Sequence, residues 1–211
     1  TLFRSRLTLK SDIDFNKYYI VGGDHQIDAM MKSRGFMPAN HRDAGIVIFT
    51  GGADVTPLMY HDIRHHTTNC NPERDDAETQ MFQWTHGKLR VGICRGGQFL
   101  NVLSGGKMWQ DVDNHGGIHE IDYIDAKGVA RKFEVTSTHH QMMSPGETAQ
   151  IWGTCHRSTY RDSGGTKRRP VDPGTPDIEI LYYPLTKSLC FQPHPEYHSK
   201  SCRNLFFACL D

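Results

Sequence analysis

The stretch VGICRGGQFL, residues 91–100, joins a short apolar run to a helix-like pattern through one cysteine that has a glycine two positions before it and two after it. A strand that turns abruptly into a helix needs small residues at those positions, because larger side chains would collide in the sharp turn. The pattern Gly92-x-Cys94-x-Gly96 therefore predicts a nucleophile elbow, the thiol counterpart of G-x-S-x-G, in an α/β fold. By itself it also fits a buried cysteine with glycine neighbours.

The position of Cys94 in front of a helix also bears on its chemistry. The positive end of the helix favours a thiolate, and the N–H of Arg95 is the natural first donor to an oxyanion formed there. A nucleophilic thiol further needs a base and a group that orients the base. The segment CFQPHPEYH supplies both, because His194 and Glu196 alternate along one extended run and can point the same way.

Strand-like and helix-like segments alternate through the first half of the chain. The strand-like runs cover 17–23, 44–52 and 89–94, and the helix-like stretches cover 25–35 and 71–88. Such alternation is typical of βαβ units, with a parallel sheet and helices on both faces. In the second helix Asn71 is the expected N-cap, ahead of a proline at the first helical position. Its expected apolar face consists of Ala77, Met81, Phe82 and Trp84.

The second half of the chain is richer in strands. The expected strands cover 132–138, 149–156, 177–183 and 188–192, with the last two forming a hairpin. The glycine- and proline-rich segment 161–176 predicts an exposed irregular loop. A basic cluster in and beside it is either a solvated charge run or an anion site near the pocket mouth; it consists of Arg157, Arg161, Lys167, Arg168 and Arg169.

Size and composition narrow the class of protein. A chain of 211 residues predicts one domain, 1–211, and its 24 basic and 24 acidic residues make nucleic acid an unexpected partner. The longest apolar runs are too short to span a membrane, so we expect no membrane partner. Six scattered cysteines suit a reducing, cytoplasmic setting, with Cys190, Cys202 and Cys209 as buried packing.

No metal or other cofactor is expected from the motifs. The chain has 13 histidines, and the segment that most resembles a ligand set contains His61, His65, His66 and Cys70. Its spacing fits no established zinc pattern, and the segment is typical of a polar loop.

Six motifs, taken in order, resemble those of the class I glutamine amidotransferases, which have a Cys-His-Glu triad. They are FTGGADVTP, ERDDAE, GICRGGQFLNVLSGGKMWQD, TSTHHQ, IEI and FQPHPE, and they extend from about residue 44 to about residue 198. The details are most similar to the free-standing, peptidase C26-like hydrolases of the γ-glutamyl-γ-aminobutyrate hydrolase type. The resemblance implies a three-layer, flavodoxin-like α/β fold whose mostly parallel central sheet has helices on both faces.

The resemblance also implies a role for each matched residue. Cys94 would form a γ-glutamyl thioester, His194 would act as base and acid, and Glu196 would orient His194. The N–H groups of Gly52 and Arg95 would form the oxyanion hole. Substrate binding would fall to Gln98 and to the backbone around His139 and Gln141.

The chain departs from the family in two places. Gln141 stands where glutamine-binding relatives often have glycine, which makes the pocket wall bulkier, and the chain before residue 44 is less recognisable. From the residues themselves, Asp54 is expected to cap its own loop. Arg74 and Asp75 are expected to form a structural ion network at the start of a helix. Of the pair His139 and His140, one is expected to be structural and the other to line the pocket through its backbone.

Two functions are compatible with this resemblance. The first is a free-standing hydrolase that cleaves a γ-glutamyl amide, a small-molecule substrate, to glutamate and an amine or ammonia. The second is a glutaminase subunit that supplies ammonia to a separate synthetase or amidoligase. A second copy of the chain, in a homodimer, is a further partner to consider. A catalytically silent binding protein is disfavoured by the intact Cys94, His194 and Glu196.

Overall fold

The centre of the protein is a sheet of nine strands, as seen in a computed structural model that describes residues 13–125, 127–165, 168–197 and 199–211. Along the sheet the order is β2-β1-β3-β4-β14-β13-β10-β7-β8. The four pairings from β2 to β14 are parallel, and the four from β14 to β8 are antiparallel. The parallel half holds the predicted βαβ units, and the antiparallel half follows from the strand-rich second half of the sequence.

The nine strands have the following bounds: β1 Lys17–Ile20, β2 Met37–Pro38, β3 Ile46–Phe49, β4 Leu89–Ile93, β7 Gly116–Ile124, β8 Ala130–Thr138, β10 Gln150–Cys155, β13 Asp177–Tyr183 and β14 Ser188–Phe191. The expected hairpin is confirmed, because β13 and β14 pair antiparallel. The long strand β7 was not predicted, although its buried His119, Ile121 and Tyr123 alternate with more exposed residues.

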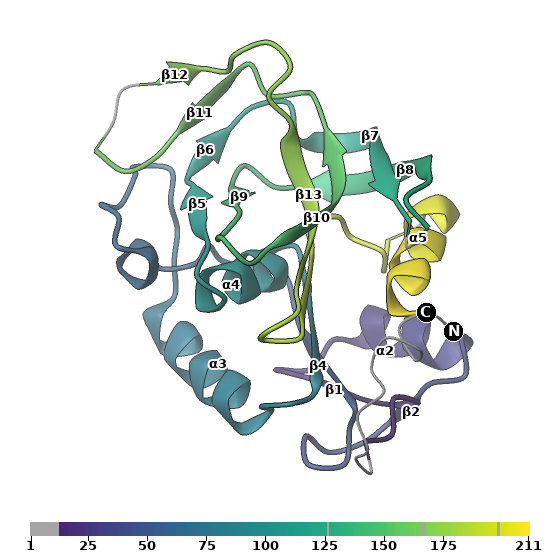
Figure 1. Ribbon diagram of the computed structural model, residues 1–211. Helices are drawn as coiled ribbons and strands as arrows, with labels where there is room; N and C mark the ends of the chain where they lie inside the picture. The colour runs from purple at the N-terminus through teal and green to yellow at the C-terminus, as the bar shows by residue number, and fades with distance from the viewer. Residues whose placement is uncertain (1–12, 126, 166–167, 198) are drawn as a thin grey trace.

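Helices cover both faces of the sheet (Figure 1). Helices α2 (His25–Ser33) and α5 (Lys200–Leu210) lie on one side, and α3 (Pro72–Trp84) and α4 (Arg95–Leu103) lie on the other. Successive residues of β3 point to opposite faces, so Ile46 and Ile48 join the core under α2 and α5, while Val47 and Phe49 join the core under α4. This arrangement confirms the α/β fold with a central sheet between helices.

Two smaller sheets lie beside the main one. One has the order β12-β11-β6 and the other pairs β5 with β9. The strands of these two sheets are β5 Lys107–Trp109, β6 Asp111–Val112, β9 Met142–Ser144, β11 Tyr160–Asp162 and β12 Arg169–Pro170. A short 3₁₀ helix, η1, covers Pro57–Tyr60. The prediction of an irregular exposed loop over 161–176 is therefore wrong in part, because Arg161 and Asp162 are buried in a strand.

Helix α3 begins where the sequence predicts, since Asn71 caps it by accepting a hydrogen bond from the N–H of Arg74. Its predicted apolar face is wrong at Ala77 and Trp84, which are exposed, while Met81 and Phe82 are half-buried. The buried side chains of the helix are two acids instead, Asp75 and Glu78. They face inward because a buried arginine of α4 pairs with both.

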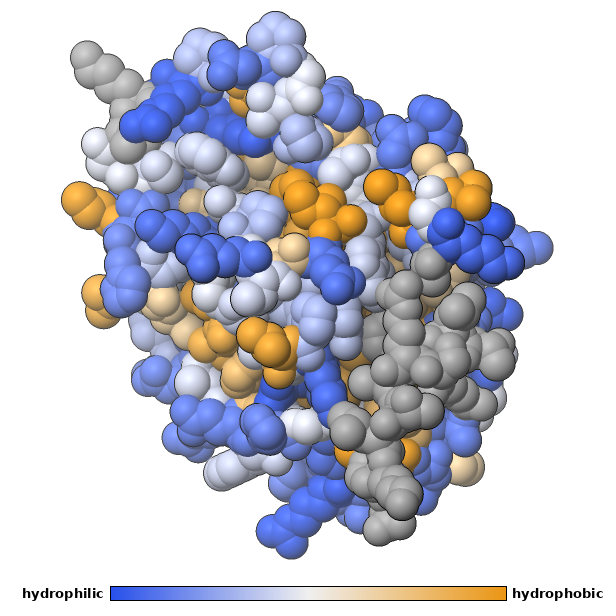
Figure 2. All heavy atoms as spheres, viewed as in Figure 1, coloured by the Kyte–Doolittle hydropathy of each residue, from blue (hydrophilic) through white to orange (hydrophobic). Residues whose placement is uncertain are grey.

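The surface seen in Figure 2 is mostly hydrophilic, and its exposed apolar side chains lie in separate islands. The most exposed large apolar side chains include Leu58, Ile63, Trp84 and Leu185. Across the described ranges, the structure has no helix of the length and apolarity needed to cross a membrane.

Candidate active site

The predicted elbow forms where β4 ends and α4 begins. Cys94 occupies this turn with a φ of 51° and a ψ of −113°, a conformation that is costly for a residue with a side chain. The two glycines allow the turn, because a Cβ on Gly92 would overlap the backbone of Gly96, and a Cβ on Gly96 would overlap the backbone of Phe49. The turn holds Cys94 at the carboxyl end of the central strand β4, only 8% exposed.

His194 and Glu196 follow β14, the strand that pairs with β4. The Nδ1 of His194 lies 2.6 Å from Oε1 of Glu196. The N–H of His194 donates to the carbonyl of Thr136 at 2.8 Å, and the hydroxyl of Thr136 donates to the carbonyl of His194 at 2.8 Å. These two hydrogen bonds fix the segment against β8. Burial lowers the pKa of His194, but its contacts with Cys94 and Glu196 outweigh burial and raise the pKa to about 10. These contacts favour the imidazolium form of His194 beside Cys94.

The loop after β3 places Gly51 beside the nucleophile and its proposed base. A Cβ on Gly51 would lie 3.2 Å from Cε1 of His194 and 3.8 Å from Cβ of Cys94. The carbonyl of Gly51 accepts a 3.0 Å hydrogen bond from Nη1 of Arg74. In a trans peptide the N–H points opposite to the carbonyl. The bond from Arg74 to the Gly51 carbonyl therefore holds the N–H of Gly52, in the same peptide, pointing away from Arg74. Gly52 has a φ of 136°, and a Cβ there would overlap the Arg74 guanidinium.

A buried ion network supports both halves of this arrangement. The guanidinium of Arg95 pairs with Asp75 and with Glu78, and Glu78 also accepts a 2.8 Å hydrogen bond from Nε of Arg74. The second oxygen of Asp75 accepts from the N–H of Thr56 at 2.9 Å. The expected ion network of Arg74 and Asp75 exists, but it reaches beyond the start of α3 and ties the Gly51–Gly52 loop to the elbow.

A cleft of about 240 Å³ opens beside Cys94. Six of the eight residues singled out from the sequence line it: Gly52, Cys94, Arg95, Gln98, His139 and Gln141. His194 and Glu196 approach Cys94 from the strand β14 instead. The structure thus brings the sequence-derived site residues together around one thiol.

Three buried polar side chains, Gln98, His139 and Gln141, form part of the cleft wall. The Nε2 of Gln98 donates to the carbonyl of Gln141 at 3.1 Å, and Nδ1 of His139 lies 2.8 Å from the same carbonyl. The side-chain Nε2 of Gln141 donates to Oγ1 of Thr68 at 3.0 Å, whereas its Oε1 is buried without a hydrogen-bond partner among the described residues. The carbonyl of Gln141 is thus engaged within the protein, whereas its buried side-chain oxygen is left without a donor among the described residues.

Sequence reasoning missed two neighbours of the triad. The amide of Gln192 lies 3.7 Å from Sγ of Cys94 and 3.2 Å from Nε2 of Gln98. The ring of Tyr197 stacks on that of His194 with centroids 4.5 Å apart and an interplanar angle of 3°. Both residues flank the PHPE segment, so their closeness in sequence to His194 was the available signal.

Two surface expectations need correction. Asp54 does not cap its own loop; its carboxylate accepts from the N–H of Asn69 at 2.8 Å and lies 3.3 Å from Nε2 of His140 at the cleft mouth.

In the basic cluster, Arg161 is neither solvated nor open to an anion, because it is buried and bonds Asp177 at 2.7 Å. Arg168 and Arg169 are exposed, and Lys167 lies outside the described residues.

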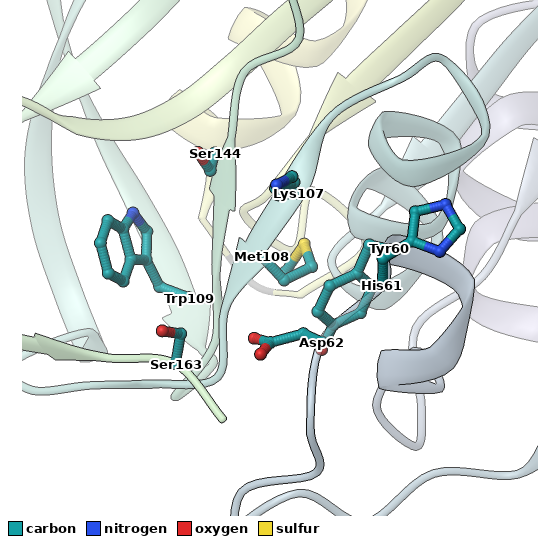
Figure 3. Close-up of a pocket in the computed structure, with 8 residues that line it drawn as sticks. All are labelled: Tyr60, His61, Asp62, Lys107, Met108, Trp109, Ser144 and Ser163. Atoms are coloured by element: carbon teal, nitrogen blue, oxygen red, sulfur yellow. The ribbon is translucent and has the colours of Figure 1, made fainter. Parts of the chain in front are cut away.

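A second cavity, of about 250 Å³, lies between the end of η1 and strands β5 and β9 (Figure 3). Tyr60, His61 and Asp62 form one side of it, and Lys107, Met108 and Trp109 come from β5. It contains none of the residues singled out as catalytic or substrate-binding from the sequence. The cleft at Cys94 is therefore the cavity at which the reactive groups converge.

The histidines of segment 61–70 do not gather around a common point with Cys70 in the part of the chain that the structure describes. The residues whose ligand atoms do cluster come from three strands of the antiparallel half and the position just before one of them: His115, His119, Cys155 and Glu179. The first and last of these lie 64 positions apart, so no local spacing indicates the set.

Replacing Arg74 with glutamine is expected to lower kcat about 10- to 100-fold with a much smaller change in KM. The reason is that the Gly51–Gly52 peptide would lose the donor that orients it, and the resemblance implies that the N–H of Gly52 binds the oxyanion. Steady-state kinetics of glutamate release measure the effect, with the exposed Arg42→Gln as the matched control. A change confined to KM would argue against this role.

Comparison with known proteins agrees with this geometry. Residues 43–143 match the family model of peptidase C26. A putative glutamine amidotransferase from Mycobacterium tuberculosis is 30% identical over 174 residues, which are 78% of this chain and 54% of that protein. Other curated relatives are matched over shorter stretches, down to 29% of their own length, so this chain spans about half or less of the relatives it matches.

Two solved structures share the fold over most of their length. A putative GMP synthase subunit from Thermoplasma acidophilum has a TM-score of 0.62 at 16% identity, with 91% of this chain and 90% of that chain covered. A glutamine amidotransferase from Thermotoga maritima has a TM-score of 0.62 at 11% identity, with 94% and 84% covered. The resemblance drawn from the motifs is confirmed, and the solved structures share the fold.

Proposed function

We propose that this chain, which is similar to peptidase C26 over residues 43–143 and to a putative glutamine amidotransferase over 174 residues, hydrolyses a γ-glutamyl amide through a thioester on Cys94. The observation that carries the proposal is the convergence of Cys94, His194 and Glu196 at a strained elbow beside a cleft. The cleft, at about 240 Å³, suits a small acyl group.

In the first half of the reaction the Cys94 thiolate attacks the γ-carbonyl carbon. The carbonyl oxygen becomes an oxyanion that accepts hydrogen bonds from the N–H groups of Arg95 and Gly52. The His194 imidazolium then donates its proton to the leaving nitrogen, the C–N bond breaks, and an amine or ammonia departs. Glu196, at 2.6 Å, keeps the imidazole oriented and stabilises its positive charge.

In the second half His194, now neutral, removes a proton from a water molecule. The resulting hydroxide attacks the thioester carbon, the C–S bond breaks, and glutamate leaves with the Cys94 thiolate restored. The glutamyl head group would lie against the wall of Gln98, His139 and Gln141.

The decisive experiment incubates the purified chain with glutamine and with a panel of γ-glutamyl amines and measures glutamate release. Fast turnover of a γ-glutamyl amine by the chain alone is the expected result. Trapping by rapid quench and intact mass spectrometry should show one glutamyl group on Cys94. Equal turnover by Cys94→Ala would overturn the mechanism.

A glutaminase subunit is the second candidate, and the observation that favours it is the shared fold with a protein named as a subunit of GMP synthase. Slow cleavage of glutamine alone, with no γ-glutamyl amine turned over, would favour this candidate over the hydrolase. A synthetase or amidoligase partner, or a homodimer, would then be sought by size-exclusion chromatography with light scattering.

The pH profile gives a further prediction. With the pKa of His194 at about 10, kcat/KM should fall as pH rises through that value, because the proton donor to the leaving nitrogen is lost. Glu196→Gln removes a carboxylate that raises this pKa, so the alkaline limb should move to lower pH by about one unit. The exposed Glu147→Gln is the control and should leave the limb in place; an unmoved limb in Glu196→Gln would contradict the assignment.

A further inference from the structure

Four side chains meet on three neighbouring strands of the antiparallel half, away from the reacting thiol. His119 lies on β7, Cys155 on β10 and Glu179 on β13, and these strands are adjacent in the sheet (Figure 1), while His115 directly precedes β7. The side chains of His115 and Glu179 are 0% exposed, and that of His119 is 1% exposed. The proposed reaction uses none of the four.

Three distances from Glu179 are close to those between the ligand atoms of a tetrahedral zinc site. Its Oε1 lies 3.2 Å from Nδ1 of His115, 3.2 Å from Nε2 of His119 and 3.4 Å from Sγ of Cys155. Zinc bonds of about 2.0–2.3 Å in a tetrahedron place ligand atoms roughly 3.3–3.7 Å apart. All four ligand atoms lie within 4.8 Å of one another, so closing the set requires shifts of about 1 Å.

The imidazole of His115 is oriented for a ligand. Its Nδ1 faces the cluster but has no hydrogen-bond partner among the described residues, although it is fully buried. Its other nitrogen, Nε2, lies 3.1 Å from Oγ of Ser158 and 3.3 Å from Oδ2 of Asp177, a carboxylate that also pairs with Arg161 at 2.7 Å. A carboxylate commonly lies behind a histidine that faces a metal, because it fixes the tautomer with the lone pair toward the ion.

The charges also balance around a divalent cation. A thiolate on Cys155 and the carboxylate of Glu179 would neutralise two positive charges, and two neutral imidazoles would complete the set. Outside the set, Asp177 is already neutralised by Arg161. Mixed nitrogen, sulfur and carboxylate donors in four-fold arrangement favour zinc over magnesium or calcium, which take oxygen ligands.

We propose that His115, His119, Cys155 and Glu179 bind one Zn²⁺ ion, in a structural site that joins β7, β10 and β13. The site is separate from Cys94 but adjoins the cleft wall. His139 bridges the two, because its Nε2 lies 3.9 Å from Oε1 of Glu179 and its Nδ1 bonds the carbonyl of Gln141. Zinc binding would therefore stiffen the wall against which the glutamyl group is proposed to rest.

The test uses Co²⁺ as a spectroscopic substitute for Zn²⁺ in the full chain. Chelator-treated protein is titrated with CoCl₂, and tetrahedral d–d bands with a thiolate-to-cobalt charge-transfer band are expected, saturating at about one ion per chain. Zn²⁺ should bleach these bands and raise Tm by several degrees, because it binds the folded chain. Elemental analysis of the purified protein should find zinc at a comparable ratio.

Cysteine variants identify which thiolate binds the metal ion. Cys155→Ala should lose the charge-transfer band, whereas Cys94→Ala and the buried-cysteine control Cys209→Ala should keep it. If Cys155→Ala does not fold, the Cys94→Ala spectrum still decides between the catalytic thiol and another cysteine. The absence of thiolate-to-cobalt bands in the wild-type chain, with no shift of Tm by Zn²⁺, would overturn the proposal and leave the cluster as a hydrogen-bond network.

Discussion

Cys94→Ala is expected to lower glutamate release by about 10⁴-fold or more while the chain remains folded. The thiol is the proposed nucleophile, and none of the other side chains that line the cleft can form the thioester in its place. The substitution removes one sulfur from a site that is 8% exposed, so the fold should tolerate it. Glutamate release and circular dichroism, measured on the same preparation, separate loss of chemistry from loss of structure.

The matched control for this variant is Cys209→Ala. Cys209 is as buried as the nucleophile but lies in α5, within the core under that helix. It should lose stability through a small cavity and keep kcat within about twofold. Activity that falls equally in both variants would mean that cavity formation, not nucleophilic chemistry, explains the loss.

Gly96→Ala is expected to destabilise the protein by more than about 3 kcal/mol, lowering Tm by about 6–12 °C. Its Cβ would overlap the backbone carbonyl of Phe49 in β3, and a backbone atom inside a sheet cannot move aside as a flexible side chain can. Gly92→Ala should behave similarly, because its Cβ would overlap the backbone of Gly96. Thermal unfolding and urea titration measure both effects.

Gly116→Ala is the control for the glycine variants. A Cβ at Gly116 would meet no atom within 4 Å, and its φ is not in the left-handed region. It should change stability by less than about 0.5 kcal/mol. A Gly96→Ala protein as stable as Gly116→Ala would show that α4 can shift away from β3, and the elbow would then be less constrained than its contacts indicate.

The features that were predicted correctly are those set by local residue order. The N-cap at Asn71, the strand–turn–helix at Cys94 and the β13–β14 hairpin each depend on neighbours in the chain. The apolar face of α3 was predicted wrongly because hydrophobicity alone could not anticipate a buried arginine. Arg95 draws Asp75 and Glu78 inward, and that leaves Ala77 and Trp84 on the surface.

By itself, the sequence determined the class of fold and singled out Cys94, His194 and Glu196 as the expected reactive groups, since the cysteine between two glycines and the His194–Glu196 pair are local patterns. Only the tertiary structure decided which groups act on one another. Arg74 reaches the Gly51 carbonyl across 23 positions, and Glu179 reaches His119 across 60. Such contacts depend on the order and register of the strands, which no single segment encodes, because a sheet is assembled from pairings between distant parts of the chain.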